Sequence, residues 1–203
     1  MGDASGVFDS MCYNEKNDKA VKGPGKEHGT MNETLKVLKE RRSIRKYKPE
    51  QLREEDLSAI LEAGTWAPTA RNLQTPVMVV VQDKETIARM AAANAKIWGK
   101  PGTDPFFGAP TVVVVLADGT AQNWLQDGSL VMGNLMTAAA ATGVGSCWIN
   151  RCMEYFDAPE GKALLREWGL PETLRGVGNC ILGYPDGPAP APKPRKEGWI
   201  IRR

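Results

Sequence analysis

The segment that most constrains the fold is residues 122–142, which places apolar side chains on nearly every side when it is wound as a helix. Such a helix would be about 30 Å long at 1.5 Å per residue. A helix that is apolar all round is buried in a core or in a subunit interface. A chain of 203 residues offers little depth in which to hide it, which makes the interface the more attractive position.

The composition suits one folded domain or one subunit of a compact oligomer. Hydrophobic residues make up 42% of the chain and charged residues 25%, which argues against a wholly disordered protein. No run of 18 or more apolar residues and no signal sequence is present, so no membrane association is expected. The 4 cysteines form no CxxC pair, which indicates neither a zinc ribbon nor a disulfide framework and favours a reduced, cytoplasmic protein.

Charge and histidine content limit the chemistry that the chain can perform. The net charge of +2 is too small to favour nucleic acid as a partner. The only histidine, His28, lies in the polar N-terminal stretch. Ser–His or Cys–His catalysis is therefore disfavoured, and no metal site is expected. If the chain is an enzyme, its chemistry belongs to a bound cofactor.

Turn residues and apolar periodicity divide the chain into two parts. Residues 1–30 are interpreted as a flexible leader, either a tag or a native extension, and residues 31–203 as one domain, with Met31 an equally good start. Thr30 and Glu33 have capping-box spacing for a first helix that ends by Tyr47. The further elements expected are a helix at 53–63 closed by Gly64, a strand at 76–81, a helix at 83–97, a strand at 111–117, the long helix, an extended piece at 146–150, a helix at 157–168 and a strand at 177–183. The continuous apolar runs at 76–81 and 111–117 predict strands covered on both faces.

The segment Arg41-Arg-Ser-Ile-Arg45 carries the sharpest local signal. Arg41 and Arg45 meet on one face if the segment is helical, and Arg41, Ser43 and Arg45 share a side if it is extended. In both cases two converging guanidinium groups suit a phosphate. The alternative is a solvated, basic helix end.

Three further segments could contact a ligand, and each has a structural alternative. Residues 68–74 form a loop with amide and hydroxyl groups that suit a planar heterocycle or a polyol, or merely connect a helix to a strand. At 143–150, glycines allow close backbone approach and Trp148 packs on a ring or fills the core; Cys147 and Cys152 are interpreted as inert. From Pro185 a Pro-rich arm carries Lys193 and Arg195, which reach the same phosphate or belong to a soluble tail. The end of the arm, at 199–201, is expected to dock, because it is apolar.

Together and in this order, the motifs resemble the nitroreductase family of FMN-dependent enzymes over about residues 32–203. The resemblance rests on RRSIRKY (41–47), APTARNLQTP (67–76), the long helix leading into GVGSCWI (143–149), LGYP (182–185) and KPR (193–195). It implies an α+β class and a three-layer α-β-α fold that forms an intertwined homodimer. It also implies two FMN molecules per dimer, bound at the interface.

The resemblance also assigns residues to parts of the cofactor. Phosphate and ribityl would be held by Arg41, Arg42, Ser43 and Arg45, completed by Lys193 and Arg195. The partner subunit would offer Pro68, Thr69, Ala70, Asn72 and Gln74, while Trp148, Ile149, Asn150 and Arg151 would lie against the isoalloxazine. Two features depart from the family pattern: Gln74-Thr-Pro76-Val replaces Gln-Pro-Trp, and the match around Asn94, Lys96 and Lys100 is poor, so these three receive no role.

The implied activity is hydride transfer from NAD(P)H through flavin N5 to electron-poor acceptors such as nitroaromatics or quinones, in a ping-pong cycle. One alternative keeps the fold but changes the chemistry to reductive dehalogenation or flavin consumption, which would depend on a lid at about 95–109. The other is a non-enzymatic protein that binds anions or nucleic acid.

Overall fold

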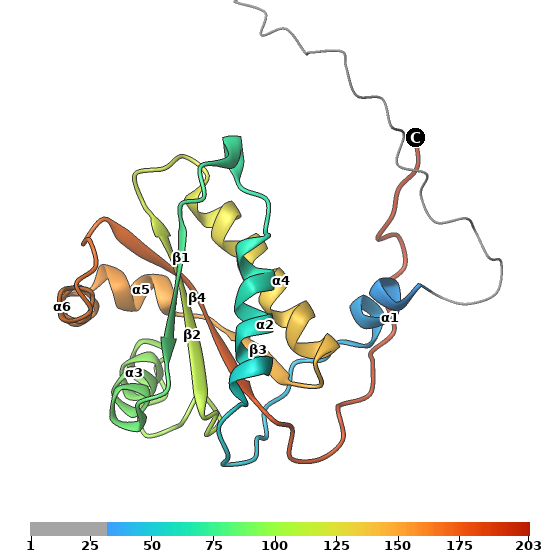
Figure 1. Cartoon of the computed structure of the whole chain (residues 1–203), viewed down its shortest axis with the longest axis horizontal. Helices are drawn as coiled ribbons and strands as arrows, with labels where there is room; N and C mark the ends of the chain where they lie inside the picture. The colour runs from blue at the N-terminus through green and yellow to red at the C-terminus, as the bar shows by residue number, and fades with distance from the viewer. Residues whose placement is uncertain (1–31) are drawn as a thin grey trace, which may run out of the picture. The chain divides into compact units, whose positions relative to one another are not determined.

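The apolar β-branched runs form one four-stranded sheet in the computed structural model, which describes residues 32–203 (Figure 1). The strands lie in the order β1-β2-β4-β3, and every neighbouring pair is antiparallel. Their bounds are β1 Pro76–Val81, β2 Thr111–Asp118, β3 Gly145–Ile149 and β4 Leu174–Gly183. The expected leader, the Thr30 capping box and the possible start at Met31 lie outside the described residues.

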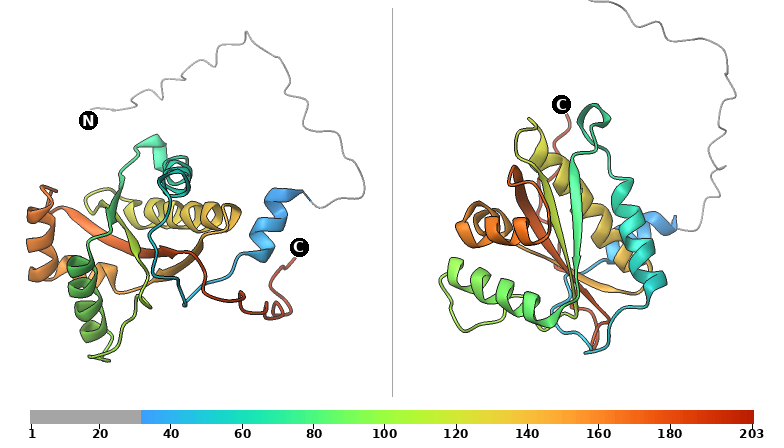
Figure 2. Two further views of the ribbon diagram at one scale, coloured as in Figure 1. Left: turned by 60° about the horizontal axis from the view of Figure 1, so that its bottom comes forward. Right: turned by 60° about the vertical axis from the view of Figure 1, so that its left-hand side comes forward.

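Helices cover both faces of this sheet (Figures 1 and 2). On one face lie α2 (Glu54–Thr65) and α4 (Trp124–Ala141), and on the other lie α3 (Lys84–Ile97), α5 (Cys152–Asp157) and α6 (Pro159–Glu167). The described residues therefore have the predicted α+β class and α-β-α layering. The predicted dimer is a separate matter, because a single chain does not test it.

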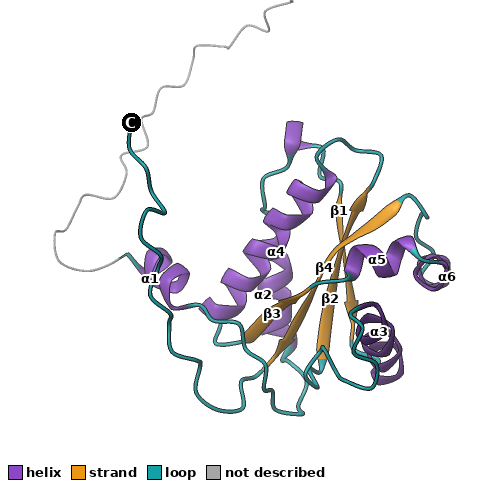
Figure 3. Ribbon diagram, turned by 180° about the vertical axis from the view of Figure 1, so that it is seen from behind, coloured by secondary structure: helices purple, strands orange, loops and turns teal. Residues whose placement is uncertain are grey.

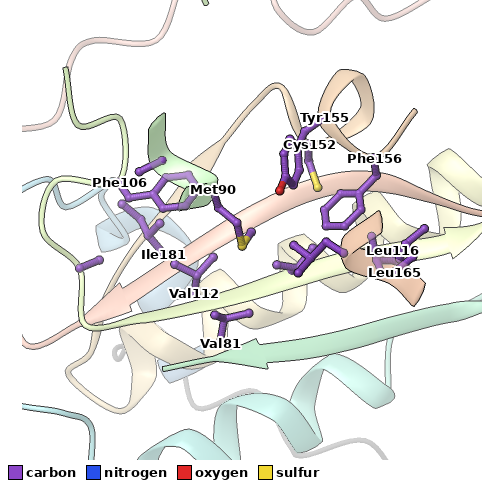
Figure 4. Packing of buried hydrophobic residues seen from close by; sticks show 14 of the residues in the cluster. Val81, Met90, Phe106, Val112, Leu116, Cys152, Tyr155, Phe156, Leu165 and Ile181 are labelled. Atoms are coloured by element: carbon purple, nitrogen blue, oxygen red, sulfur yellow. The ribbon is translucent and has the colours of Figure 1, made fainter. Parts of the chain in front are cut away.

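The core consists of two apolar clusters, one on each face of the sheet. Figure 4 shows the cluster under α3, α5 and α6, where Met90, Phe106 and Phe156 pack on Val112 and Leu116. The second cluster joins α2 and α4 to the opposite side of the same strands. β2 is buried on both faces as predicted. β1 is also covered on both faces, with Val81 in the first cluster and Met78 against the second, but as an edge strand it is only half-buried along most of its length.

The predicted long apolar helix is present as α4, and only part of its apolar surface is buried within the chain. Met132, Leu135 and Ala139 of α4 are fully buried against the sheet. Leu125 and Leu130 on the same helix remain 37% and 46% exposed. One stripe of α4 thus belongs to the core, while another stripe faces outward.

The first helix ends at Glu40, well before the predicted limit at Tyr47, and this decides the conformation of the arginine segment. α1 (Glu33–Glu40) begins at Asn32, whose side chain accepts a 3.0 Å hydrogen bond from the Thr34 N–H. After Glu40 the chain is extended, because its backbone pairs with β3: Ser43 bridges to Ser146 in parallel. The helical alternative for residues 41–45 is therefore wrong, and the extended alternative is confirmed.

Two other helix boundaries also differ from the predictions. Gly64 lies inside α2 and not after its end. A side chain at this position would collide with β1, because a Cβ on Gly64 would come within 2.7 Å of Met78 Sδ. The helix expected at 157–168 begins at Pro159, and the short helix α5 before it was not predicted.

The C-terminal arm leaves the sheet after β4 and runs near α1 (Figures 1 and 3). A backbone bridge between Tyr47 and Pro185 and an ion pair of 2.7 Å between Lys46 Nζ and Asp186 Oδ2 hold its first residues. Its end is open to solvent: Trp199 is 67%, Ile200 80% and Ile201 71% exposed. The docking of this end stays a prediction, because nothing within the described chain covers it.

Candidate functional site

A cavity of about 260 Å³ opens where β3 ends. Three aromatic side chains supply much of its wall, from α3 and the following loop (Trp98, Phe107) and from β3 (Trp148). Its other lining residues are Arg45, Asn94, Pro105, Ile149, Asn150 and Arg151. Flat aromatic walls with a few polar groups are typical of sites for planar ligands. The structure thus brings Arg45 together with the whole segment 148–151 that the sequence singled out.

One buried amide fixes the backbone at the floor of this cavity. Asn94 on α3 is 3% exposed, and its Nδ2 donates a 2.7 Å hydrogen bond to the Asn150 carbonyl. In a trans peptide the N–H points away from the preceding carbonyl, so this bond also sets the direction of the Arg151 N–H. The sequence analysis gave Asn94 no role. The signal that could have found it is a polar residue between Ala91 and Ala95 on the buried stripe of α3.

Trp148 fills the core, and it also lines the cavity, so its packing on a ligand ring stays a prediction. Its indole packs over Gly178, where a Cβ would come within 2.6 Å of Nε1, and it adjoins the apolar cluster under α4. Cys152 behind this segment is buried, and burial raises the pKa of its thiol well above the ordinary value. A thiol held in this protonated form is a poor nucleophile.

The arginines of the extended segment occupy different places. Arg45 has its guanidinium 6.0 Å from the centre of the Phe107 ring. Arg41 lines a second cavity, of about 200 Å³, together with Gly143, Gly145 and Ala189 of the arm. Arg41 and Arg45 thus line different cavities of the chain, and extended residues four apart are about 13 Å apart along the backbone. Their convergence on one phosphate stays a prediction.

Arg41 and Arg42 differ in whether their guanidinium groups already have hydrogen-bond partners. Arg41 Nη1 is buried and has no hydrogen-bond partner among the described residues. Arg42, in contrast, uses Nη1 to donate to the carbonyls of Lys39 and Arg41, at 2.8 Å each. The guanidinium of Arg42 thus secures the end of α1, whereas that of Arg41 still lacks an acceptor.

The loop from Pro68 to Gln74 is exposed and conformationally strained. Arg71, Asn72 and Gln74 all have positive φ values, of 54°, 53° and 51°, a region that non-glycine residues seldom adopt. Its short helical turn, η1 (Ala70–Asn72), is held from α4: the Ala70 N–H donates to the buried Asp127 Oδ1 at 3.0 Å.

This loop lies far along the sheet from the arginine row. It precedes Pro76, which shares an end of the sheet with Leu174 at the start of β4. Ser43 lies instead beside Ser146, which pairs with Leu182 near the end of β4. Lys193 and Arg195 are exposed on the arm. One chain therefore does not unite the predicted phosphate, ring and loop residues.

Two classes of feature are absent from the described part of the chain. Residues 32–203 contain no group of three or more His, Cys, Asp or Glu side chains placed to hold a metal ion. None of the helices in the same range is both long and apolar enough to cross a membrane.

Comparison with known proteins shows the family to which the chain belongs. The nitroreductase family pattern matches residues 38–184. A protein of Archaeoglobus fulgidus, named provisionally as an NADH dehydrogenase/NAD(P)H nitroreductase, is 34% identical over 160 residues, which cover 76% of this chain and 87% of the relative. The chain belongs to the nitroreductase family. The resemblance inferred from the motifs is thus confirmed, and the protein is an oxidoreductase of that family.

Other members share both the sequence and the fold of this nitroreductase-family protein. The FMN reductase [NAD(P)H] of Bacillus subtilis is 28% identical over 189 residues, which cover 81% of this chain and 70% of that protein. The crystal structure of a nitroreductase with bound FMN from Bacteroides fragilis superposes with a TM-score of 0.78 at 30% identity, over 85% of this chain and 100% of that one.

Proposed function

We propose that this nitroreductase-family protein binds FMN and uses it to carry hydride from NAD(P)H to electron-poor acceptors such as nitroaromatics or quinones. The observation that carries the proposal is the cavity at the end of β3. It combines aromatic walls, the Arg45 cation and a peptide fixed by Asn94. The B. fragilis relative, which has FMN bound, shares this fold.

The donors along the extended segment fit the phosphate and ribityl parts of FMN. Arg41 has a buried Nη1 without an acceptor among residues 32–203, which leaves a charged donor that an anionic ligand would satisfy. Arg41, Ser43 and Arg45 lie on one side of an extended strand, so they form a row and not a cluster. FMN is itself elongated, with its phosphate and its ring at opposite ends, and a row of donors suits it.

A second copy of the chain would complete the site. The cavity of about 260 Å³ lies just below the roughly 300–1,000 Å³ that is typical of small-molecule sites. The strained loop with Asn72 and Gln74 lies elsewhere on the chain and is exposed. Apolar side chains that a dimer would cover are also exposed: Leu35, Leu38, Trp66, Leu73 and Leu130. We infer a homodimer in which each loop faces the partner's cavity.

The bound flavin would supply the redox chemistry, accepting hydride at N5 from NAD(P)H and passing it on to the acceptor. Arg45 would place a positive charge beside the ring, which favours negative charge there. The Arg151 N–H, oriented by Asn94, would offer a fixed donor to the ring edge. Trp98 and Phe107 would restrict water and stack on flat substrates. Nicotinamide and acceptor would use this one cavity in turn, as a ping-pong cycle requires.

A visible spectrum of the purified protein, before and after incubation with FMN, tests the proposal. The expected result is a bound flavin spectrum that bleaches when NADH or NADPH is added without oxygen and recovers with a quinone. Protein that stays colourless after incubation with FMN would refute the proposal. Recovery with halogenated tyrosine but not with quinone would instead favour the reductive dehalogenase alternative.

A further inference from the structure

Arg151 occupies a backbone position that an arginine seldom takes. It is the first residue before α5, and its φ is 71°. Glycine adopts such values without a Cβ penalty, whereas other residues pay for them. Strained residues of this kind persist where the surroundings fix them, and they concentrate at functional sites. The side chain at this position is therefore worth examining for a role of its own.

Arg151 lines the cavity, and its guanidinium is paired with a carboxylate outside the lining. Its Nη1 donates to Glu154 Oε1 at 2.7 Å, and both side chains are 45% exposed. A half-exposed pair of this kind contributes little to stability, so the pair alone does not account for an arginine at a strained position. Glu154 is not among the residues that line the cavity, and the lining contains no acidic side chain.

The cavity therefore presents positive charge beside aromatic surfaces. Arg45 and Arg151 are its two cations, and Trp98, Phe107 and Trp148 are its rings. Under the proposed function, Arg45 is committed to the flavin. Arg151 contributes only its backbone N–H to the flavin, and its guanidinium stays available for a second molecule that enters the cavity.

We propose, resting on the function proposed above, that Arg151 is a specificity-determining residue that selects flat aromatic acceptors carrying a carboxylate or sulfonate. The planar guanidinium pairs with such an anion through two parallel hydrogen bonds. The acceptor ring stacks between the flavin and the wall formed by Trp98 and Phe107. Glu154 holds the guanidinium in place until the anionic acceptor replaces it as partner.

Two matched acceptors test this selection: 4-nitrobenzoate and 4-nitrobenzamide, which have nearly the same shape and differ in charge. The quantity compared is the ratio of their kcat/KM values in the wild type, Arg151→Gly, Arg151→Lys and Glu154→Gln. Loss of a charged hydrogen-bonding partner predicts a fall of about tenfold in this ratio for Arg151→Gly, mainly through KM for the benzoate. Arg151→Lys should keep part of the preference, and Glu154→Gln should raise it, because the competing carboxylate is gone.

The melting temperature of Arg151→Gly distinguishes the proposed role from a purely structural one, which would predict a less stable variant. Because glycine suits the left-handed backbone, Arg151→Gly should melt no lower than the wild type while losing selectivity. An unchanged acceptor ratio in both Arg151→Gly and Glu154→Gln would overturn the inference. So would a change confined to the NADPH/NADH ratio, because the cation would then recognise the phosphate of the reductant. If the wild type binds no FMN and reduces neither acceptor, the proposed function itself fails.

Discussion

Asp56 shows how one side chain connects distant parts of the chain. Its carboxylate accepts hydrogen bonds from Arg53 Nε and Nη2, both at 3.0 Å, and from the Tyr184 hydroxyl at 2.6 Å. Tyr184 directly follows β4, whereas Asp56 lies in the first turn of α2. The side-chain hydrogen bonds from Arg53 and Tyr184 lower the pKa of Asp56 below its usual value.

The Asp56→Asn variant should be less stable than the wild type at pH 7, by an amount that shrinks in acid. A carboxylate with a lowered folded-state pKa contributes its full stability above its unfolded pKa of about 3.9. The contribution is lost as pH falls through the lower folded value. Urea unfolding of both proteins at pH 7 and pH 3 measures the difference. A difference that is the same at both pH values would contradict this role.

At the level of single residues, the sequence predicted which residues line the cavity better than it predicted the contacts that they make there. Arg45 and the segment Trp148–Arg151 do meet, because they flank the end of one strand. Asn94 was missed because its role depends on the Asn150 carbonyl, 56 residues away in sequence. The strain at Arg151 was also missed, since no local motif predicts an arginine in the left-handed region.

At the level of elements, α4 holds the strained loop in place. Asn134 Nδ2 donates to the Ala63 carbonyl at the end of α2, at 2.9 Å. Asp127, two turns earlier on the same helix, accepts from the Ala70 N–H. One helix therefore bonds both to the end of α2 that precedes the loop and to the Ala70 N–H within the loop. An exposed loop with three positive-φ residues needs such support to keep one conformation.

The Asp127→Ala variant should bind FMN about tenfold more weakly, while losing only about 1 kcal/mol of stability through one hydrogen bond. The loop would relax away from the shape in which it meets the partner's flavin. Asp127→Asn is the matched control, because its amide oxygen still accepts from the Ala70 N–H. FMN fluorescence titration and thermal melting measure the two effects. Equal FMN affinity in the wild type and Asp127→Ala would contradict a contribution of this loop to FMN binding.

Element boundaries were predictable where capping and periodicity acted alone. Helix α3 and strand β2 closely match their predicted ranges. The end of α1 could not be found in this way, because Ser43 leaves the helix to pair with Ser146, about one hundred residues later in the chain. α5 was missed because six residues are too few to show a helical period.

At the level of the whole molecule, the exposed apolar side chains of α4 indicate a surface that a partner would cover. Leu130 is 46% exposed, and Leu35 and Leu38 on α1 are 53% and 55% exposed. Large apolar side chains that are exposed on the single chain would be covered by a partner if they form part of an interaction surface. The sequence predicted a buried α4, and the single chain buries only part of that helix, which is why the remaining stripe is assigned to a second copy.

The Leu130→Glu variant should therefore be a monomer that retains little FMN. A carboxylate buried at an apolar interface would lose its hydration without gaining a partner. Ile97→Glu is the control, since Ile97 is also partly exposed, at 37%, but lies on α3 across the sheet. Sedimentation velocity and the flavin absorbance of each sample measure the result. A Leu130→Glu dimer with full FMN content would place the interface elsewhere.

A subunit-mixing experiment tests most directly whether two copies share each flavin. One chain would carry Arg41→Ala and Arg45→Ala, and the other Asn72→Ala and Gln74→Ala, with different purification tags. Each homodimer should bind almost no FMN. The doubly tagged heterodimer should bind about one FMN per dimer, because one of its two sites would combine an intact arginine row with an intact loop. A heterodimer as empty as its parents would contradict a site built from both chains.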